Sequence, residues 1–196
     1  MIDMMFDLEG GTIPAAYSFA LWAALIQRVP QLEQEKSVGI LPLRGTEINE
    51  DMLLPKRSKL VMRLPTTLAE QTATSLSGQQ LDIAGHTLRL GAAKKRSIQP
   101  FPTLHAQLVT GASDEALFVE HINARLGEMR IKANLICGKR SIIKDDSQSI
   151  HGYSLVVHDL SPEASLHLQF AGLGEGRQFG CGIFVPSKVI SGLKEG

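Results

Sequence analysis

The sequence predicts an α+β protein in which the element order β-α-β-β-α-β occurs twice. Short stretches of alternating apolar and polar residues, typical of half-buried strands, are separated by two helical stretches in each half of the chain. A basic segment with two prolines, residues 92–102, lies between the halves. We therefore predict one domain over residues 1–92 and a second over residues 93–196.

In the first half, strands are expected at residues 2–8, 38–43 and 60–64, and a hairpin at residues 81–90. Thr12 and Pro14 suit the start of a helix over residues 15–29, which is apolar around nearly its whole circumference. Residues 47–55 are expected to form a loop. A second helix is expected over residues 66–76, which completes the first unit.

The second half repeats this order, with strands expected at residues 104–110, 133–143, 150–160 and 183–185. A helix capped by Ser113 or Asp114 is expected to run to Met129. Ser161-Pro162-Glu163 combines a capping hydroxyl, a proline at the first helical position and an early acid, so a second helix begins there. Gly172 is suited to end that helix. Two such units in tandem predict two ferredoxin-like (RRM-like) domains.

The charged residues balance, because 20 basic and 20 acidic side chains give no net charge. They are segregated along the chain, however. One segment without acid holds Arg130, Lys132, Lys139, Arg140 and Lys144, and a shorter one holds Lys56, Arg57, Lys59 and Arg63. This segregation predicts a basic face on a neutral protein.

Several classes of protein are disfavoured by composition. Cys137 and Cys181, the two cysteines, have neither metal-ligand spacing nor a disulfide framework, so we expect no metal and no cofactor. Asp3 and Asp7 stand where a signal peptide would be basic, and no apolar run reaches the roughly 18 residues of a membrane span. We expect a cytoplasmic protein without a membrane partner.

A glycine-rich stretch near the C-terminus carries the strongest functional signal. Five glycines fall within residues 172–182, and the stretch leads into an apolar strand closed by Pro186. Glycine is favoured where the backbone takes positive φ or approaches a ligand closely. A dinucleotide fingerprint needs a strand before the glycines and a helix after them, and this stretch has the opposite order.

The order Gly-Leu-Gly, five residues, Gly-Cys-Gly, apolar strand, Pro resembles the C-terminal signature of the CRISPR repeat-RNA processing endoribonucleases, the sixth Cas family within the RAMP superfamily. The resemblance implies tandem ferredoxin-like domains, in agreement with the element order. It also implies binding of a CRISPR repeat stem-loop RNA and metal-independent cleavage of precursor CRISPR RNA, in which a ribose 2′-OH attacks the adjacent phosphate and leaves a 2′,3′-cyclic phosphate. The resemblance further implies that the protein stays on the mature guide RNA together with other CRISPR effector subunits.

The candidate RNA-binding residues are cations in three segments together with residues of the glycine-rich stretch. They are Lys94, Lys95, Arg96, Arg125, Arg130, Lys132, Lys139, Arg140, Lys144, Gly174, Gly176, Arg177 and Gln178. For each cation, the alternative to an RNA contact is an ordinary solvated charge on the surface. Only 5% of residues are aromatic, so recognition of a folded hairpin by charge and shape is favoured over base stacking.

Tyr17 is the candidate catalytic residue. In the family that this chain resembles, an Ile/Leu-Pro-Ala segment like residues 13–15 is followed by Asp-His. This chain has Ala16 and Tyr17 at those two positions. No histidine precedes His86. A tyrosine is a poor general base at neutral pH but can orient a nucleophile by a hydrogen bond. The alternative is a packed helix residue.

Two other functions remain open on the sequence alone. The first is a structural subunit that binds the RNA hairpin with weak or no cleavage. The second is an unrelated ferredoxin-like module that binds a small anion at the glycine-rich stretch.

Overall fold

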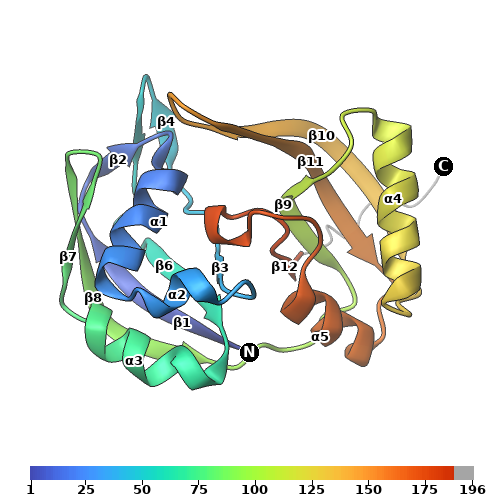
Figure 1. Ribbon diagram of the computed structural model, residues 1–196, viewed down its shortest axis with the longest axis horizontal. Coiled ribbons are helices and arrows are strands. Elements are labelled where there is room, and N and C mark those ends of the chain that lie inside the picture. The colour runs from blue at the N-terminus through green and yellow to red at the C-terminus, as the bar shows by residue number, and fades with distance from the viewer. Residues whose placement is uncertain (188–196) are drawn as a thin grey trace.

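The computed structural model describes residues 1–187, where two antiparallel sheets stand side by side (Figure 1). The first has the order β3-β6-β1-β8-β7, with the bounds β1 Ile2–Glu9, β3 Gly39–Ile40, β6 Lys59–Leu64, β7 Gln80–Ile83 and β8 His86–Arg96. The second has the order β10-β11-β9-β12, with the bounds β9 Leu104–Thr110, β10 Asn134–Lys144, β11 Ser149–His158 and β12 Val185–Pro186. A small third sheet, β2-β5-β4, comprises β2 Thr12–Pro14, β4 Thr46–Ile48 and β5 Asp51–Leu53.

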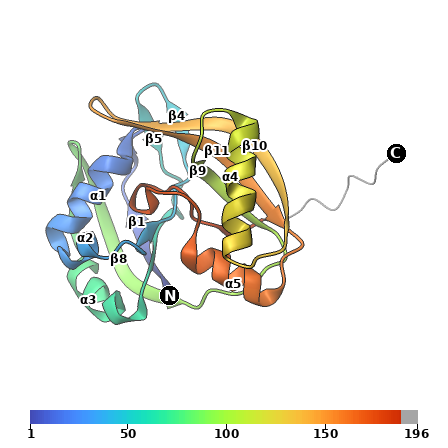
Figure 2. The same ribbon diagram turned by 45° about the vertical axis from the view of Figure 1, so that its right-hand side comes forward.

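The helices divide between the two main sheets (Figures 1 and 2). With the first sheet go α1 Tyr17–Arg28, α2 Gln31–Gln34 and α3 Thr66–Leu76, and with the second go α4 Glu115–Glu128 and α5 Pro162–Ala171. The short 3₁₀ helix η1 Arg177–Phe179 follows α5 in the chain but packs against β3 and α1 of the first unit. None of the helices within residues 1–187 is long and apolar enough to cross a membrane.

Strand order confirms the predicted fold class. Numbered within its own unit, each main sheet runs second, third, first and fourth strand, and β7 adds a hairpin partner to β8 at one edge. All pairings are antiparallel, as in a ferredoxin-like sheet. One hydrophobic core spans residues 4–90 and another spans residues 104–184. The domain boundary at residues 92 and 93 stays a prediction, and residues 188–196 of the predicted second domain lie outside the described residues.

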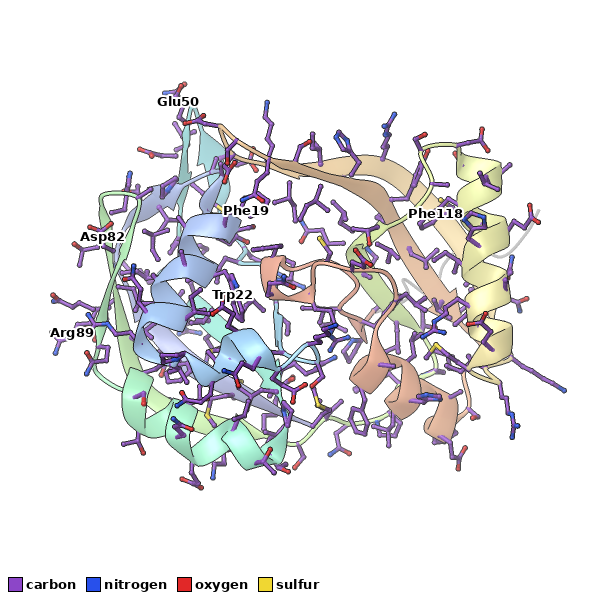
Figure 3. All side chains as sticks on the ribbon, viewed as in Figure 1. Phe19, Trp22, Glu50, Asp82, Arg89 and Phe118 are labelled. Carbon is purple, nitrogen blue, oxygen red and sulfur yellow. The ribbon has the colours of Figure 1, made fainter. Side chains whose placement is uncertain are left out.

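Alternation in β1 shows how the sequence builds the first core. Met4 and Phe6 are fully buried and point towards the helices, while Asp3 and Met5 point to the opposite face. Burying a side chain of this size stabilises the fold by about 1.5–3 kcal/mol. In the second core, Phe118 of α4 stacks on Tyr153 of β11 with ring centroids 4.9 Å apart (Figure 3).

Helix starts in the second unit agree with the predicted caps. The carboxylate of Asp114 accepts a hydrogen bond from the backbone N–H of Leu117 at 2.9 Å. The hydroxyl of Ser161 accepts one from Ala164 at 3.2 Å, and α5 ends at Gly172 with φ 68°. These three signals act within a few residues, so they could be recognised in the sequence.

Two predictions in the first unit are wrong. Thr12 and Pro14 do not open a helix, because β2 pairs with β5 and buries Ile13 completely; α1 starts at Tyr17. Residues 47–55 are not a loop, because β4 and β5 form a hairpin that turns at Asn49, where φ is 58°. Strands of three residues are too short for alternation to reveal them.

Three strand boundaries also differ from the prediction. The expected connector at residues 92–102 begins as strand, because β8 continues to Arg96 by pairing with β1. The strand expected at residues 38–43 is limited to β3, Gly39–Ile40. The strand expected at residues 183–185 is instead β12, Val185–Pro186.

Arg63 ties the two domains together. Its guanidinium, 1% exposed, bonds to the Asp3 carboxylate at 2.8 and 3.3 Å. It also donates to the backbone carbonyls of Gln169 at 3.1 Å and Phe184 at 2.8 Å, both in the second domain. The ring of Phe19 on α1 meets that of Phe179 on η1 with centroids 4.6 Å apart. The domains therefore share a packed, hydrogen-bonded seam.

Candidate functional site

A cavity of about 380 Å³ lies where the domains meet at the start of α1. Its walls come from the first turn of α1, the β4-β5 hairpin, the end of β10 and the glycine-rich stretch. The β10-β11 hairpin reaches across from the second domain towards β4 and closes one side (Figures 1 and 2). We call this space the Tyr17 cavity, because Tyr17 is part of its wall.

Tyr17 is held in one orientation within this cavity. Its oxygen accepts a hydrogen bond from the backbone N–H of Leu43 at 2.7 Å, which leaves its own O–H to donate. Burial, with a smaller contribution from the charge of Glu47, raises the pKa of Tyr17 to about 12, against the hydrogen bonds from Leu43 and Ser18. The phenol therefore stays protonated at neutral pH and serves as a hydrogen-bond donor rather than a base.

The N-terminus of α1 contributes positive potential to the same space. Ala16 and Ser18 line the cavity beside Tyr17. The N-cap residue, Ala16, gives no side-chain cap, and no acidic residue lies in the first turn. The first N–H groups of a helix lack partners within the helix and carry the positive end of its dipole, which favours an anion.

Three titratable side chains line the Tyr17 cavity: Tyr17, Glu47 and Lys144. None of the six histidines, all within residues 1–187, is among the lining residues. The sequence singled out Tyr17 and Lys144 but not Glu47, because residues 47–55 were expected to form an exposed loop. Only the pairing of β4 with β5 brings that carboxylate beside α1.

A second, larger space of about 660 Å³ lies between the outer face of the first sheet and the second domain. We call it the basic cleft, because its cationic lining residues are Arg44, Arg57, Lys59, Arg63 and Arg96. Asp3 is its one acidic lining residue within the described chain, and it is paired with Arg63. Burial and the charge of Arg44 lower the pKa of His105 on β9. Part of the acid-free segment at residues 56–63 thus gathers in one cleft with Arg96.

The predicted connector cations lie on β8 and are engaged in ion pairs. Lys94 contacts Asp7 at 2.7 Å, Arg96 contacts Asp3 at 2.9 Å, and Lys95 contacts Glu70 of α3. Hydrogen bonds from Lys94 and then Lys59 lower the pKa of Asp7. Of these three cations, Arg96 is the one that lines the basic cleft.

The cations of the second domain are spread over several surfaces. Arg125 pairs with Glu128 on α4 at 2.6 Å, and Arg130 and Lys132 are exposed beyond the end of that helix. Lys139 and Arg140 are exposed on β10, an edge strand, and Lys144 at its end reaches the Tyr17 cavity. The acid-free segment 130–144 therefore does not form a single face.

Arg177, a candidate RNA-binding cation of the glycine-rich stretch, is buried. It is 6% exposed, and its Nε–H donates to the Ser37 carbonyl of the first domain at 3.3 Å. Neither terminal nitrogen has a hydrogen-bond partner within residues 1–187. Burial, and then the charge of Arg63, lowers the pKa of Arg177 to about 10. This arginine crosses the seam in the opposite direction to Arg63, and we leave it out of the proposed RNA contacts.

The glycine-rich stretch folds into a packed loop. All five glycines have positive φ, from 64° at Gly182 to 98° at Gly180. A Cβ on Gly182 would lie 2.0 Å from the Leu173 carbonyl oxygen, so this position requires glycine. Several loop N–H groups are used internally, including those of Leu173, Glu175 and Cys181. Gly174 is exposed, whereas Gly176 and Gln178 are half-buried.

Comparisons with known proteins agree on one family. A family model described as Cas6 Crispr matches residues 2–189. A protein of Myxococcus xanthus strain DK1622 named CRISPR-associated endonuclease Cas6 is 35% identical over 187 residues, which are 94% of this chain and 81% of that protein.

Solved structures show the same fold at low identity. One described as a RAMP protein binding different RNA substrates superposes with a TM-score of 0.69 and 12% identity, over 94% of this chain and 98% of that chain. Another, described as CRISPR endoribonuclease Cse3 bound to a 19 nt RNA, superposes with a TM-score of 0.54 and 13% identity, over 94% of this chain and 98% of that chain.

Proposed function

Because this chain belongs to the Cas6 family, which its glycine motif resembled, we propose that it binds the stem-loop of a CRISPR repeat RNA and cleaves precursor CRISPR RNA in the Tyr17 cavity. The observation that carries the proposal is the meeting of Tyr17, the uncapped start of α1 and Lys144 around one space between the domains. The endonuclease name of the Myxococcus relative and the RNA held by the Cse3 structure support it.

The proposed chemistry is transesterification within the RNA. The 2′-OH next to the scissile phosphate attacks phosphorus, the bond to the 5′-oxygen breaks, and a 2′,3′-cyclic phosphate remains. The transition state carries extra negative charge on the phosphoryl oxygens, and preorganised donors stabilise such charge strongly. The Tyr17 O–H, the N-terminus of α1 and the Lys144 ammonium are the donors of this cavity.

The basic cleft is proposed to hold phosphates that flank the cleavage site. Arg44 and Arg57 are exposed and line the cleft, and contacts to phosphate fix the register of a nucleic acid without reading its sequence. Lys139 and Arg140 on β10 are proposed to contact the stem. The contacts predicted for Lys94, Lys95, Arg125, Arg130, Lys132, Gly174, Gly176 and Gln178 remain predictions.

After cleavage the protein is proposed to stay on the 3′ hairpin of the guide RNA as a subunit of a CRISPR effector complex. An RNA-binding subunit without cleavage is the second candidate, and the observation that favours it is the lack of any imidazole among the lining residues of the Tyr17 cavity. The internal hydrogen bonds of the glycine loop weigh against a separate small-anion site there.

A cleavage assay decides between the two candidates. The repeat RNA and the same RNA with a single 2′-deoxy sugar at the scissile position are incubated with the protein in EDTA and resolved on a denaturing gel. We expect one cut in the first RNA, a product that acid treatment opens to a 2′- or 3′-phosphate, and no cut in the second. Tight binding of both RNAs without any cut would favour the structural subunit.

A further inference from the structure

We propose that Glu47 is the general base that accepts the proton of the attacking 2′-OH, an inference that rests on the proposed cleavage in the Tyr17 cavity. A histidine would ordinarily take this role, and none lines the cavity. This role for Glu47 could not be predicted from the sequence, because the residue belongs to a segment expected to be loop.

The pairing of β4 with β5 directs Glu47 towards the cavity. Directly paired residues of antiparallel strands project from the same face. Glu47 pairs with Met52, which is 5% exposed, and both line the cavity. Ile48, the next residue on β4, projects from the other face and is 53% exposed. A slip of one residue in this hairpin would turn the carboxylate away from α1.

The chemistry of the lining leaves one proton acceptor. At neutral pH a phenol and an ammonium hold their protons, whereas side-chain carboxylates as a class have lost theirs. Tyr17 and Lys144 are therefore donors, and Glu47 alone among the titratable lining residues can accept a proton. The charge of Glu47 also acts on Tyr17, whose pKa it raises, so the two side chains share one electrostatic environment.

In the proposed step, one proton is taken from the attacking 2′-OH and one is given to the leaving 5′-oxygen. The Glu47 carboxylate takes the 2′-OH proton while the 2′-oxygen forms its bond to phosphorus. The bond from phosphorus to the 5′-oxygen breaks, the oxygen leaves with the electron pair, and the Lys144 ammonium supplies its proton. The products are a 2′,3′-cyclic phosphate and a 5′-hydroxyl, and Glu47 and Lys144 return to their starting states by exchange with water.

The first test compares Glu47→Gln with Glu50→Gln in single-turnover cleavage at saturating protein. Glu50, labelled in Figure 3, lies at the tip of the same hairpin and does not line the cavity. Loss of a general base costs about 10²–10⁴-fold in rate. We expect that loss for Glu47→Gln and a wild-type rate for Glu50→Gln. RNA affinity of Glu47→Gln should be unchanged or tighter, because a negative charge near the phosphate is removed.

The second test uses Glu47→His, which moves the titration of the base. We expect the acid limb of the pH–rate profile to lie at higher pH for Glu47→His than for the wild type, because imidazoles as a class gain their proton at higher pH than carboxylates. A purely structural role for Glu47 would not move the limb. A wild-type rate for Glu47→Gln would overturn this inference and leave the proposed function standing. Binding without any cleavage by the wild type would overturn both.

Discussion

The two spaces between the domains differ in charge and in volume, which is about 380 Å³ for the Tyr17 cavity and about 660 Å³ for the basic cleft. The Tyr17 cavity has three titratable lining residues of mixed character, and its phenol is fixed by a backbone hydrogen bond. The basic cleft has five cationic lining residues, and Arg44 and Arg57 among them are exposed. Pro42 belongs to both linings, so the spaces are neighbours.

On this difference we base the proposal that RNA binding and cleavage chemistry are assigned to separate places. Exposed arginines attract phosphate over a long range, but salt screens them, and they do not fix a transition state. A fixed donor beside a helix N-terminus acts only at short range, but it is held in place to stabilise a transition state. Variants in the cleft should therefore act on affinity, variants in the cavity should act on rate, and variants in the seam between them should disturb both.

The largest effect is expected from Arg63→Met. The change leaves the Asp3 carboxylate buried with only the exposed Arg96 as a partner and removes the donors to Gln169 and Phe184. Removing one partner of a buried ion pair costs about 3–5 kcal/mol in the free energy of unfolding. Urea unfolding followed by circular dichroism should show this loss, together with weaker RNA binding and slower cleavage.

Arg177→Met is the matched variant in the same seam. Arg177 has one hydrogen bond, to the Ser37 carbonyl, and two terminal nitrogens without partners in residues 1–187. Replacing a poorly paired buried cation by an apolar side chain of similar length should change stability by less than about 1 kcal/mol. A loss as large as that of Arg63→Met would show that Arg177 has a partner such as a bound water or anion.

Tyr17→Phe tests the cavity. Removal of one preorganised donor to a developing negative charge costs about 10²–10³-fold in rate. We expect that loss in single-turnover cleavage and an unchanged dissociation constant, because only the hydroxyl is lost. Tyr153→Phe is the control: it also removes one phenol hydroxyl, which donates to the Ser113 carbonyl and does not line the cavity, so it should cleave within a few-fold of wild type. A wild-type rate for Tyr17→Phe would identify Tyr17 as a packing residue.

Arg44→Gln combined with Arg57→Gln tests the basic cleft. Each lost phosphate contact should reduce the log–log salt slope of RNA binding by about 0.7–0.9, so the double variant should lose roughly 1.5 from that slope. Arg28→Gln combined with Arg89→Gln changes the net charge equally, and Arg89 lies on β8, on the side of the molecule away from the second domain (Figure 3). Equal slopes for the two double variants would mean that the cleft does not contact phosphate.

The smallest effect concerns alkaline stability. The folded pKa of Tyr17, about 12, lies above the unfolded value near 10, so the protonated phenol stabilises the fold fully below pH 10. That contribution is lost as pH rises from 10 to 12 and amounts to about 3 kcal/mol, at about 1.4 kcal/mol per pKa unit. Tyr17→Phe, which at pH 7 lacks only the hydrogen bond from Leu43, should therefore lose less stability than the wild type between pH 10 and pH 12.

The fold could be predicted from the sequence where the signals are local. Alternation in β1 and β9, the Asp114 and Ser161 caps and the glycine at residue 172 each act within a few residues. The β4-β5 hairpin was missed because its short, polar strands owe their stability to burial of Ile13 and Met52 against the rest of the domain.

The site was only partly predictable for the same reason. Tyr17 was found through a resemblance, and Lys144 through its basic segment. Glu47 and Arg44 were missed, since their places in the linings depend on which segments meet across the domain junction. The burial of Arg177 was not predicted, because it depends on how the glycine-rich loop packs this arginine against Gly172 and the first domain.

The most direct test of the division between binding and chemistry is single-turnover cleavage in EDTA, measured as a function of protein concentration for three proteins. For each, the curve gives a maximal rate and the concentration at half-maximal rate. We predict that Tyr17→Phe lowers the maximal rate about 10²–10³-fold at an unchanged half-maximal concentration. The Arg44→Gln and Arg57→Gln double variant should raise the half-maximal concentration and reach the wild-type rate at saturation. If both variants alter the same parameter, binding and chemistry are not separated in this protein.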